Sequence, residues 1–425
     1  MRDLLPHQVR IRESATERIL SVYRRYGFVR IETPALESLS ILTRSDGGEN
    51  EKLIFKVLKR GEKLESARVE DLADLGLRFD LTVPLVRYYA NNHGKLPNPL
   101  RAIQIGPVWR AERPQKGRYR QFTQCDIDVI GLASHLAEVE LIRATADALL
   151  ALDLSDLVIR INDRRILTAL TRASGFPDEA SASVLISLDK ADRIGDAGVR
   201  KELSEQGHSA GSIDKLFWLL ERLKTKGENA DGQARWGDLR VDETVVRALT
   251  EVIEAVQTDA GHRYQIRFDP TLVRGMGYYT GQIFEISYAG YSSSVAGGGR
   301  YDDMVGRFLG RPVPACGFSI GFERIASLLE ERAGAARDTS DKTVVLVEAG
   351  TPQLERALEE ARERRSRGEI VVIEPRDPKK SLGKQIYELA QQDFGAGTLY
   401  DAAGRCVDVT SELQGKRAPG AKSEA

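Results

Sequence analysis

The sequence contains few of the residues that build covalent or metal-held frameworks. Its 425 residues include only five histidines and three cysteines, Cys125, Cys316 and Cys406, and no two cysteines form a CxxC pair. Small disulfide-rich folds and structural zinc sites need closely spaced cysteines or histidines. We therefore expect neither a disulfide framework nor a metal site made by the protein itself.

Long apolar runs and an excess of one charge are also lacking. No apolar stretch approaches 18 residues, and the chain begins MRDLLPHQ, without a basic segment followed by an apolar one. These features predict a soluble, cytoplasmic protein that does not enter a membrane. Lys and Arg number 62 against 63 Asp and Glu, a net charge of -1. This balance excludes a histone-like basic coat but allows nucleic-acid binding through local basic patches.

Hydrophobic periodicity divides the chain into several parts. Residues 1–162 and 259–333 contain strand-like patterns, whereas 163–258 are dominated by helical periodicity, as in IDKLFWLLERL, and are interpreted as a helical insertion. A polar stretch at 334–342 precedes strict strand and helix alternation over 341–412, which predicts a small α/β domain. Residues 413–425 (LQGKRAPGAKSEA) are expected to be a disordered tail.

Local patterns predict individual elements. Helices are expected at 8–26, at 134–152 with Ser134 as the N-cap, and at 319–333. Strands are expected at 52–58, 77–81, 264–269 and 282–288, and a hairpin is expected from 100–112 and 119–131.

The tip and flanks of this hairpin are strongly basic. Six basic or acidic side chains fall within eleven residues: Arg110, Glu112, Arg113, Lys116, Arg118 and Arg120. A solvated charged turn is the ordinary explanation of such a run. However, Arg110 and Arg120 continue into half-buried strand patterns, and arginine binds phosphate through paired hydrogen bonds. A phosphate-bearing ligand lying on a sheet is therefore an equal alternative.

Acidic residues alternate along the second strand of the hairpin. Gln124, Asp126 and Asp128 share one face of a strand, because side chains two residues apart point the same way. Asp80 lies in a similar apolar setting, LRFDLT. Two interpretations remain open: an edge strand kept soluble by charge, or a pocket for a cationic or hydrogen-bond-donating ligand.

Three glycine-rich segments each carry an arginine. They are LVRGMGYYTG with Arg274, AGGGRYDD with Arg300, and GFSIGFERI with Arg324. GMGYYTG is one residue too long for the dinucleotide-binding G-x-G-x-x-G motif and lacks its strand-to-helix context. A tight turn is sufficient to explain the three consecutive glycines at 297–299.

Taken in order, these segments resemble the histidyl-tRNA synthetase family of class II aminoacyl-tRNA synthetases. YGFVRIETP resembles motif 1, WRAERPQKGRYRQF motif 2 and GFSIGFERI motif 3, while LVRGMGYYTG and AGGGRYDD resemble the two histidine-specific motifs. The resemblance covers most of residues 1–333 apart from the insertion. It implies an α+β fold, with an antiparallel-sheet catalytic domain interrupted by the insertion and followed by an anticodon-binding-like α/β domain. It also implies a homodimer formed through motif 1.

The resemblance further implies roles for individual residues. Arg110 would bind the ATP α-phosphate, Glu112 the adenine side and Arg324 the γ-phosphate. Arg274 would stabilise the α-phosphate during attack, partly in place of a catalytic metal, with Mg²⁺ accompanying ATP. The residues implied to bind histidine are Asp80, Thr82, Gln124, Asp128, Tyr278 and Tyr279. Those implied to approach the tRNA acceptor end are Gln115, Lys116 and Arg118.

The implied activity is ATP-dependent activation of L-histidine and its transfer to the 3′ end of tRNA(His). Gly277 stands where the family usually has an aspartate, and the C-terminal part is short. Two alternatives therefore stay open. One is a non-catalytic paralogue that regulates histidine biosynthesis, and the other is a synthetase-like enzyme that serves another acceptor.

Overall fold

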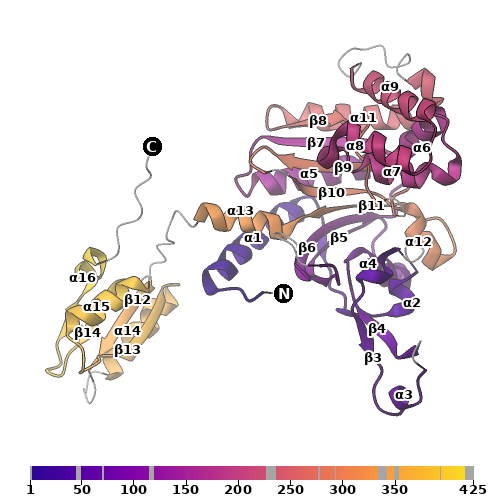
Figure 1. Cartoon of the computed structure of the whole chain (residues 1–425). Coiled ribbons are helices and arrows are strands. Elements are labelled where there is room, and N and C mark those ends of the chain that lie inside the picture. The colour runs from indigo at the N-terminus through magenta and orange to yellow at the C-terminus, as the bar shows by residue number, and fades with distance from the viewer. Residues whose placement is uncertain are drawn as a thin grey trace. The chain divides into compact units, whose positions relative to one another are not determined.

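The chain forms two compact units in a computed structural model, which describes residues 2–44, 49–68, 71–113, 119–225, 236–275, 278–291, 293–333, 342–348, 354–392 and 394–416 (Figure 1). The first unit is Met1–Ser327 and the second is Leu328–Ala425. The division falls within helix α13 (Phe322–Ala333), a few residues before the polar stretch in which the sequence places a boundary.

An eight-stranded sheet organises the first unit, with strand order β1-β5-β6-β11-β10-β9-β7-β8. The strands are β1 (Val29–Arg30), β5 (Leu100–Trp109), β6 (Gln121–Ile130), β7 (Leu157–Asp163), β8 (Tyr264–Phe268), β9 (Gln282–Tyr288), β10 (Ser294–Arg300) and β11 (Ala315–Ile320). Only the outermost pairs, β1 with β5 and β7 with β8, are parallel. The prediction of an antiparallel-rich α+β fold is confirmed.

The two faces of this sheet differ in chemistry because the side chains of a strand alternate. Along β6, Cys125 and Ile127 are buried on one face, and Asp126 and Asp128 are buried on the other. Helix α5 (Leu136–Leu150) packs on β6, β9, β10 and β11, with α1 (Pro6–Arg25) and α11 (Glu243–Ala260) beside it (Figure 1). The opposite face of the sheet therefore carries the polar residues.

The three consecutive glycines do not form a tight turn, so that expectation is wrong. They lie inside strand β10, where backbone atoms of the neighbouring strands leave no room for a side chain at Gly298 or Gly299. A Cβ at Gly298 would lie 2.1 Å from the carbonyl oxygen of Gly317, and one at Gly299 would lie 2.7 Å from that of Gln282. Glycine is needed here for close packing and not for a special backbone angle.

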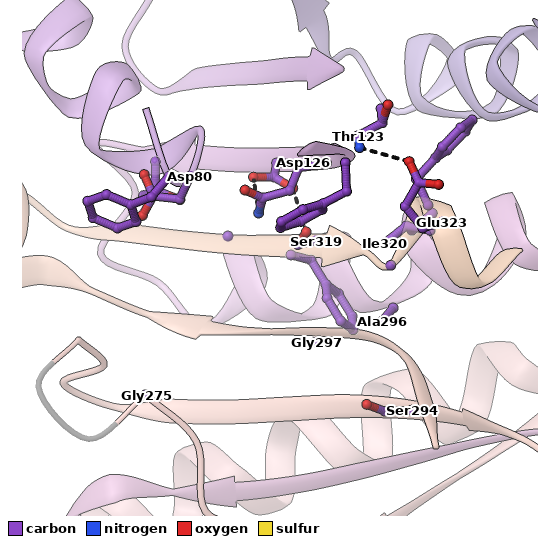
Figure 2. A pocket seen from close by; sticks show the side chains of 18 of the residues that line it. Asp80, Thr123, Asp126, Gly275, Ser294, Ala296, Gly297, Ser319, Ile320 and Glu323 are labelled. Carbon is purple, nitrogen blue, oxygen red and sulfur yellow. Dashed lines mark hydrogen bonds between the residues drawn. The ribbon is translucent and has the colours of Figure 1, made fainter. Parts of the chain in front are cut away.

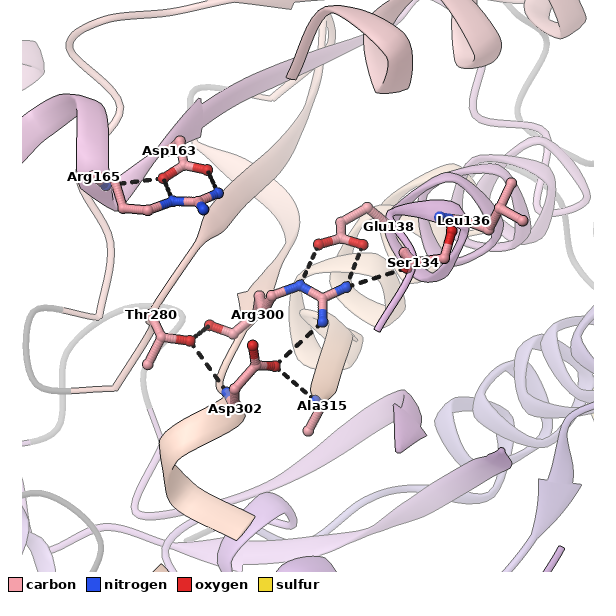
Figure 3. Close-up of polar contacts among 9 residues, drawn as sticks. All are labelled: Ser134, Leu136, Glu138, Asp163, Arg165, Thr280, Arg300, Asp302 and Ala315. Atoms are coloured by element: carbon pink, nitrogen blue, oxygen red, sulfur yellow. Dashed lines mark hydrogen bonds and ion pairs between the residues drawn. The ribbon is translucent and has the colours of Figure 1, made fainter. Parts of the chain in front are cut away.

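Arg300, at the end of β10, ties the sheet to helix α5 (Figure 3). Its Nε and Nη2 donate to the two carboxylate oxygens of Glu138 at 2.6 and 2.7 Å. Its Nη1 donates to Asp302 at 3.2 Å, and Asp302 also accepts the backbone N–H of Ala315 at 2.8 Å. Arg300 is therefore a structural ion-pair residue in this arrangement.

Helices α6 (Arg164–Ala173), α7 (Ser181–Leu188), α8 (Ala191–Glu205) and α9 (Ala210–Thr225) gather at one end of the first unit (Figure 1). They correspond to most of the predicted insertion. Helix α11 also lies in the predicted insertion, but unlike α6–α9 it packs against β8 and α5 and so helps to cover one face of the large sheet. Ser134 accepts a hydrogen bond from the N–H of Leu136 at 3.3 Å, and the residue at the N-cap of α5 is His135.

The first unit also contains a three-stranded sheet of order β2-β4-β3. Its strands are β2 (Leu36–Ser38), β3 (Lys56–Leu58) and β4 (Ala73–Leu77). Short helices α2 (Leu39–Leu42) and α3 (Glu62–Glu65) lie in the same region. The predicted strand at 77–81 is wrong, because β4 ends at Leu77. Asp80 instead accepts the N–H of Val83 at 3.0 Å in the first turn of α4 (Thr82–Asn92). The predicted strand at 52–58 shrinks to β3, preceded by a 3-10 helix at Glu49–Leu53.

Helix α12 (Asp302–Leu309) follows β10 and packs against α4 and β11, and a 3-10 turn at His93–Lys95 follows α4. The predicted helix at 319–333 begins later than expected, because Ala315–Ile320 is strand β11 and α13 starts at Phe322. Among the described residues, no helix is both long and apolar enough to cross a membrane.

The second unit is a four-stranded α/β domain of strand order β13-β12-β14-β15. Its elements are β12 (Lys342–Val347), α14 (Leu354–Ser366), β13 (Ile370–Pro375), α15 (Leu382–Gln391), β14 (Phe394–Tyr400), β15 (Cys406–Asp408) and α16 (Thr410–Gly415). The expected strand and helix alternation is confirmed. Helix α16 extends into the segment predicted to be a tail from residue 413, because Leu413 is buried against the domain core.

Candidate functional site

A cavity of about 580 Å³ opens on the polar face of the large sheet. It brings together ten residues that the sequence singles out: Asp80, Thr82, Arg110, Glu112, Gln124, Asp128, Arg274, Tyr278, Tyr279 and Arg324. They come from positions far apart in the chain, and the order of strands in the sheet places them side by side. Gln115, Lys116 and Arg118, together with Gly277, lie outside the described residues.

One end of the cavity is acidic. Asp126 and Asp128 lie on β6 and Asp80 lies just before α4, and all three line the cavity. Figure 2 shows Asp80 and Asp126. The hydroxyl of Tyr301 donates to Asp128 Oδ1 at 2.6 Å, and that of Ser319 donates to Asp126 Oδ1 at 2.5 Å. Asp128 Oδ2 is buried without a hydrogen-bond partner in the described part of the chain. This oxygen is therefore available to a ligand N–H group.

Burial changes the acidity of these carboxyl groups. The pKa of Asp126 is raised well above its ordinary value, first by burial and then by the nearby charge of Asp128. Burial and the charge of Asp80 raise the pKa of Asp128 to about 7, against the opposing effect of the Tyr301 hydrogen bond. A cationic or N–H-donating ligand would favour the ionised carboxylates and so gain binding energy from this acidic end.

The raised pKa of Asp128 predicts a pH-dependent stability. The folded protein binds this proton more tightly than the unfolded chain, whose aspartates titrate near 3.8. The contribution is therefore complete below pH 3.8 and is lost as pH rises towards about 7. Relative to Asp128→Asn, the wild type should lose up to about 1.4 kcal/mol of unfolding free energy per pH unit in this window. Urea denaturation of both proteins at several pH values measures this difference, and parallel stability curves would contradict it.

Two tyrosines form an aromatic wall beside the acidic end. The rings of Tyr278 and Tyr279 meet edge to face with centroids 5.0 Å apart, and Tyr278 lies 5.8 Å from the ring of Tyr301. Thr82 lines the same part of the cavity as Tyr278. Gly275 has a φ of +52°, and a Cβ there would come 2.6 Å from the Tyr279 ring. Glycine is thus required at this position because the backbone angle φ is positive and because a side chain would clash with the Tyr279 ring.

Three arginines line the cavity away from this acidic end. Arg110 follows β5, stacks its guanidinium 5.0 Å from the ring centroid of Phe122, and donates to the carbonyl of Phe79 at 3.1 Å. Arg324, in the first turn of α13, donates to the carbonyl of Ser294. Arg274 precedes β9 and pairs with Glu285. Three guanidinium groups from separate segments therefore line one cavity, an arrangement suited to a polyphosphate.

The N-terminal helix holds the start of α13 in place. Glu323, next to Arg324, accepts two hydrogen bonds from Arg12 of α1 at 2.6 and 2.9 Å. It also accepts the backbone N–H of Thr123 on β6 at 3.0 Å (Figure 2). This contact joins α1, β6 and α13 at the edge of the cavity.

Several residues at the site were not predicted from the sequence. Sequence reasoning gives no role to Tyr301, Ser319 and Glu323, which line the cavity, or to Glu285, which pairs with Arg274. Asp126 also lines the cavity, in agreement with the interpretation of the alternating acidic face as a ligand pocket. Tyr301 lies within AGGGRYDD, so its motif was a usable signal. Ser319 reaches Asp126 only because β11 pairs with β6, with Ser319 opposite Asp126 and Gly317 opposite Asp128. No local pattern reveals that pairing.

The family model and two curated relatives that match the chain carry the description histidyl-tRNA synthetase or histidine–tRNA ligase. The model of the family described as histidyl-tRNA synthetase matches residues 1–325. A histidine–tRNA ligase of Leifsonia xyli is 50% identical over 359 residues, covering 82% of each chain. A probable histidine–tRNA ligase of Tropheryma whipplei is 44% identical over 351 residues, covering 78% of this chain and 79% of the relative.

Solved structures agree with these matches. The crystal structure of histidyl-tRNA synthetase from Nostoc sp. PCC 7120 has a TM-score of 0.76 at 27% identity, covering 98% of this chain and 97% of that chain. A Bacillus halodurans protein described as an ATP phosphoribosyltransferase regulatory subunit/histidyl-tRNA synthetase has a TM-score of 0.74 at 24% identity. The second likeness concerns the fold alone.

Proposed function

The chain belongs to the histidyl-tRNA synthetase family, and we propose on this premise that it is a histidine–tRNA ligase with its active site in the cavity described above. The observation that carries the assignment is the pairing of opposite chemistries in one cavity. Asp80, Asp126 and Asp128 line it together with Arg110, Arg274 and Arg324. Carboxylates suit the amino group and imidazole of histidine, and arginines suit the triphosphate of ATP.

In the first step, a carboxylate oxygen of histidine attacks the α-phosphorus of ATP. A C–O–P bond forms, the bond between the α-phosphorus and its bridging oxygen breaks, and pyrophosphate leaves. The two reactants are both anionic, so their repulsion and the developing charge on the phosphate form much of the barrier. We assign Arg110 and Arg274 to the α-phosphate, Arg324 to the γ-phosphate and Glu112 to the adenine side. No general base is needed because the attacking carboxylate is already ionised.

Mg²⁺ would enter this reaction with ATP. In the described part of the chain, no three His, Cys, Asp or Glu side chains are grouped as a metal cage. Mg²⁺ commonly takes most of its ligands from substrate phosphates and water. Its contribution would be to neutralise phosphate charge, and the arginines act on the same charge from the protein side.

Histidine would occupy the acidic end of the cavity. We assign Asp80, Thr82 and Gln124 to its amino group, and Asp128 with Tyr278 and Tyr279 to its imidazole ring. The ionised Asp128 accepts an imidazole N–H, while Tyr301 fixes the orientation of its other oxygen. Three buried carboxylates remain in the pocket although residue 277 is glycine. A pocket built from hydrogen-bonding groups rejects apolar analogues of similar shape.

The second step, transfer of histidine to tRNA, needs contacts with the tRNA. We assign Gln115, Lys116 and Arg118 to the acceptor end, and the C-terminal α/β unit to the anticodon. A homodimer would form through the YGFVRIETP segment, whose strand β1 is an edge strand of the large sheet. Val29 on that strand is 50% exposed. The cytoplasm, where tRNA is charged, is the proposed compartment.

Histidine-dependent ATP–pyrophosphate exchange tests the ligase assignment. We expect exchange with L-histidine and no exchange with other amino acids, because only histidine satisfies the acidic end of the cavity. The purified protein should then transfer labelled histidine to tRNA(His). Absence of exchange would favour a regulatory paralogue, and exchange without transfer would favour an enzyme that serves another acceptor.

A further inference from the structure

The guanidinium of Arg274 is held in place from two sides. Its Nη1 donates to Oε2 of Glu285 on strand β9. Its plane lies against Gly297 of strand β10, where a Cβ would come 2.3 Å from Cζ and 2.4 Å from both Nη1 and Nη2. A carboxylate on one strand and the missing side chain on the next strand together define where this guanidinium can sit.

Glu285 is itself fixed by a second arginine. Its other oxygen, Oε1, accepts a hydrogen bond from Arg160 Nη2 at 2.6 Å. Arg160 is anchored in turn by Asp269 at 3.3 Å. The side chains of Glu285 and Arg160 are only 11% and 18% exposed. Because its two oxygens bind different arginines, Glu285 cannot rotate without breaking a charge-assisted hydrogen bond.

These residues form one row across three neighbouring strands. Arg160 of β7 lies directly opposite Glu285 of β9, and Glu285 lies directly opposite Gly297 of β10. Paired residues of adjacent strands point to the same face, so the row lies on a single face of the sheet. Gly297 and Arg274 line the cavity, whereas Glu285 and Arg160 are not part of its lining.

We propose that Glu285 is a positioning residue for adenylate formation, which sets the guanidinium of Arg274 against the floor made by Gly297. The inference rests on the proposed function, because it takes Arg274 as the group that stabilises the reacting phosphate. An arginine side chain has many rotamers, and a misplacement of about 1 Å can cost roughly 100-fold in rate. Glu285 and Gly297 remove that freedom before the substrates bind.

Glu285→Gln tests the proposal. Glutamine keeps one acceptor oxygen but places an amide donor against one of the two arginines, so the row loses its fixed geometry. In the exchange assay we expect kcat to fall roughly 10- to 100-fold. The KM for histidine should stay within about threefold, since Glu285 contacts no residue assigned to histidine.

Asp259→Asn is the matched control. Asp259 is also shared by two arginines, Arg143 at 2.8 Å and Arg263 at 3.5 Å, but none of the three lines the cavity. Its kcat should equal that of the wild type. If Asp259→Asn and Glu285→Gln lower kcat equally, Glu285 acts through general stability and the proposal is overturned.

A double-mutant comparison separates positioning from a structural role. Adding Glu285→Gln to Arg274→Ala should lower kcat by less than about twofold, because the group that Glu285 positions is already gone. An equal loss in both backgrounds would overturn the proposal. The two proposals fail in different ways. If the wild type shows no histidine-dependent exchange, the ligase assignment is wrong. If the wild type shows exchange and Glu285→Gln has the same kcat, only the positioning role of Glu285 is wrong.

Gly297→Ala tests the position of the Arg274 guanidinium from the side opposite Glu285. It also provides a test if the Glu285→Gln protein does not fold. The three atoms nearest to the new methyl group all belong to the end of the Arg274 side chain, which can move aside without changing the sheet. We expect kcat to fall at least about tenfold with an unchanged midpoint of thermal unfolding. A folded Gly297→Ala enzyme with wild-type kcat would overturn the proposal.

Discussion

Arg274→Ala should reduce the rate of histidine-dependent pyrophosphate exchange by roughly 1,000-fold, the loss typical of removing one preorganised donor to developing negative charge. Histidine binding should remain, because the acidic end of the cavity is built from other segments. The fold should also survive, since Glu285 keeps its 2.6 Å hydrogen bond to Arg160. Exchange kinetics together with calorimetric titration of histidine would measure the two effects separately.

Arg263→Ala is a suitable control for this experiment. Arg263 also pairs with a carboxylate, Asp147 at 2.6 Å, but it lies outside the cavity lining. It should leave exchange unchanged. Normal exchange by Arg274→Ala would remove Arg274 from the chemistry, and a parallel loss of histidine affinity would mean that the arginine supports the pocket as a whole.

Asp128→Asn should lower kcat/KM for histidine by roughly 1,000-fold, at nearly constant side-chain shape. Asparagine can keep the acceptor for Tyr301 at the Oδ1 position, so the amide nitrogen replaces the buried Oδ2. A ligand N–H would then meet another N–H. Sites that hydrogen-bond a substrate typically reject an analogue without the matching group by a factor of about 10⁴ or more. Asp80 and Asp126 can partly replace the lost hydrogen bond, so we expect a smaller loss of kcat/KM here.

Asp147→Asn provides the matched control. Asp147 also accepts a hydrogen bond from a tyrosine hydroxyl, that of Tyr26, at 2.6 Å, but it lies on α5 and outside the cavity. Steady-state exchange at varied histidine concentration should separate the two variants. A similar kcat/KM for both would show that Asp128 does not bind the substrate.

The sequence predicts the local chemistry of the cavity better than its geometry. The alternation of Gln124, Asp126 and Asp128 follows from the two-residue period of a strand, and all three line the cavity. A tight turn is a sufficient explanation of the glycines at 297–299 when only the composition is considered, because glycine permits many backbone conformations. Their actual role is to let β10 pass close to Arg274 and to the backbone of β11, which is a property of tertiary packing.

Long-range strand pairing accounts for what the sequence did not predict. Tyr301 and Ser319 contact the carboxylates of β6 from 173 and 193 positions later in the chain, and Glu285 contacts Arg160 across the whole insertion. The prediction of a strand at 77–81 is wrong for a different reason. The alternation of apolar and charged residues in LRFDL fits a strand, but the backbone N–H of Val83 donates to the Asp80 side chain, and this hydrogen bond lies in the first turn of a helix.

The pairing of β6 with β11 also has a consequence for the order in which the protein is made. Asp126 is synthesised about 190 residues before its partner Ser319. At about 5–20 residues per second, a growing chain carries β6 for roughly 10 to 40 s before the strand that completes its edge emerges. During that time an unpaired strand edge is open to wrong partners. No fragment that ends before β11 can contain the complete cavity, so the nascent chain gains this cavity only when almost the whole first unit has been translated.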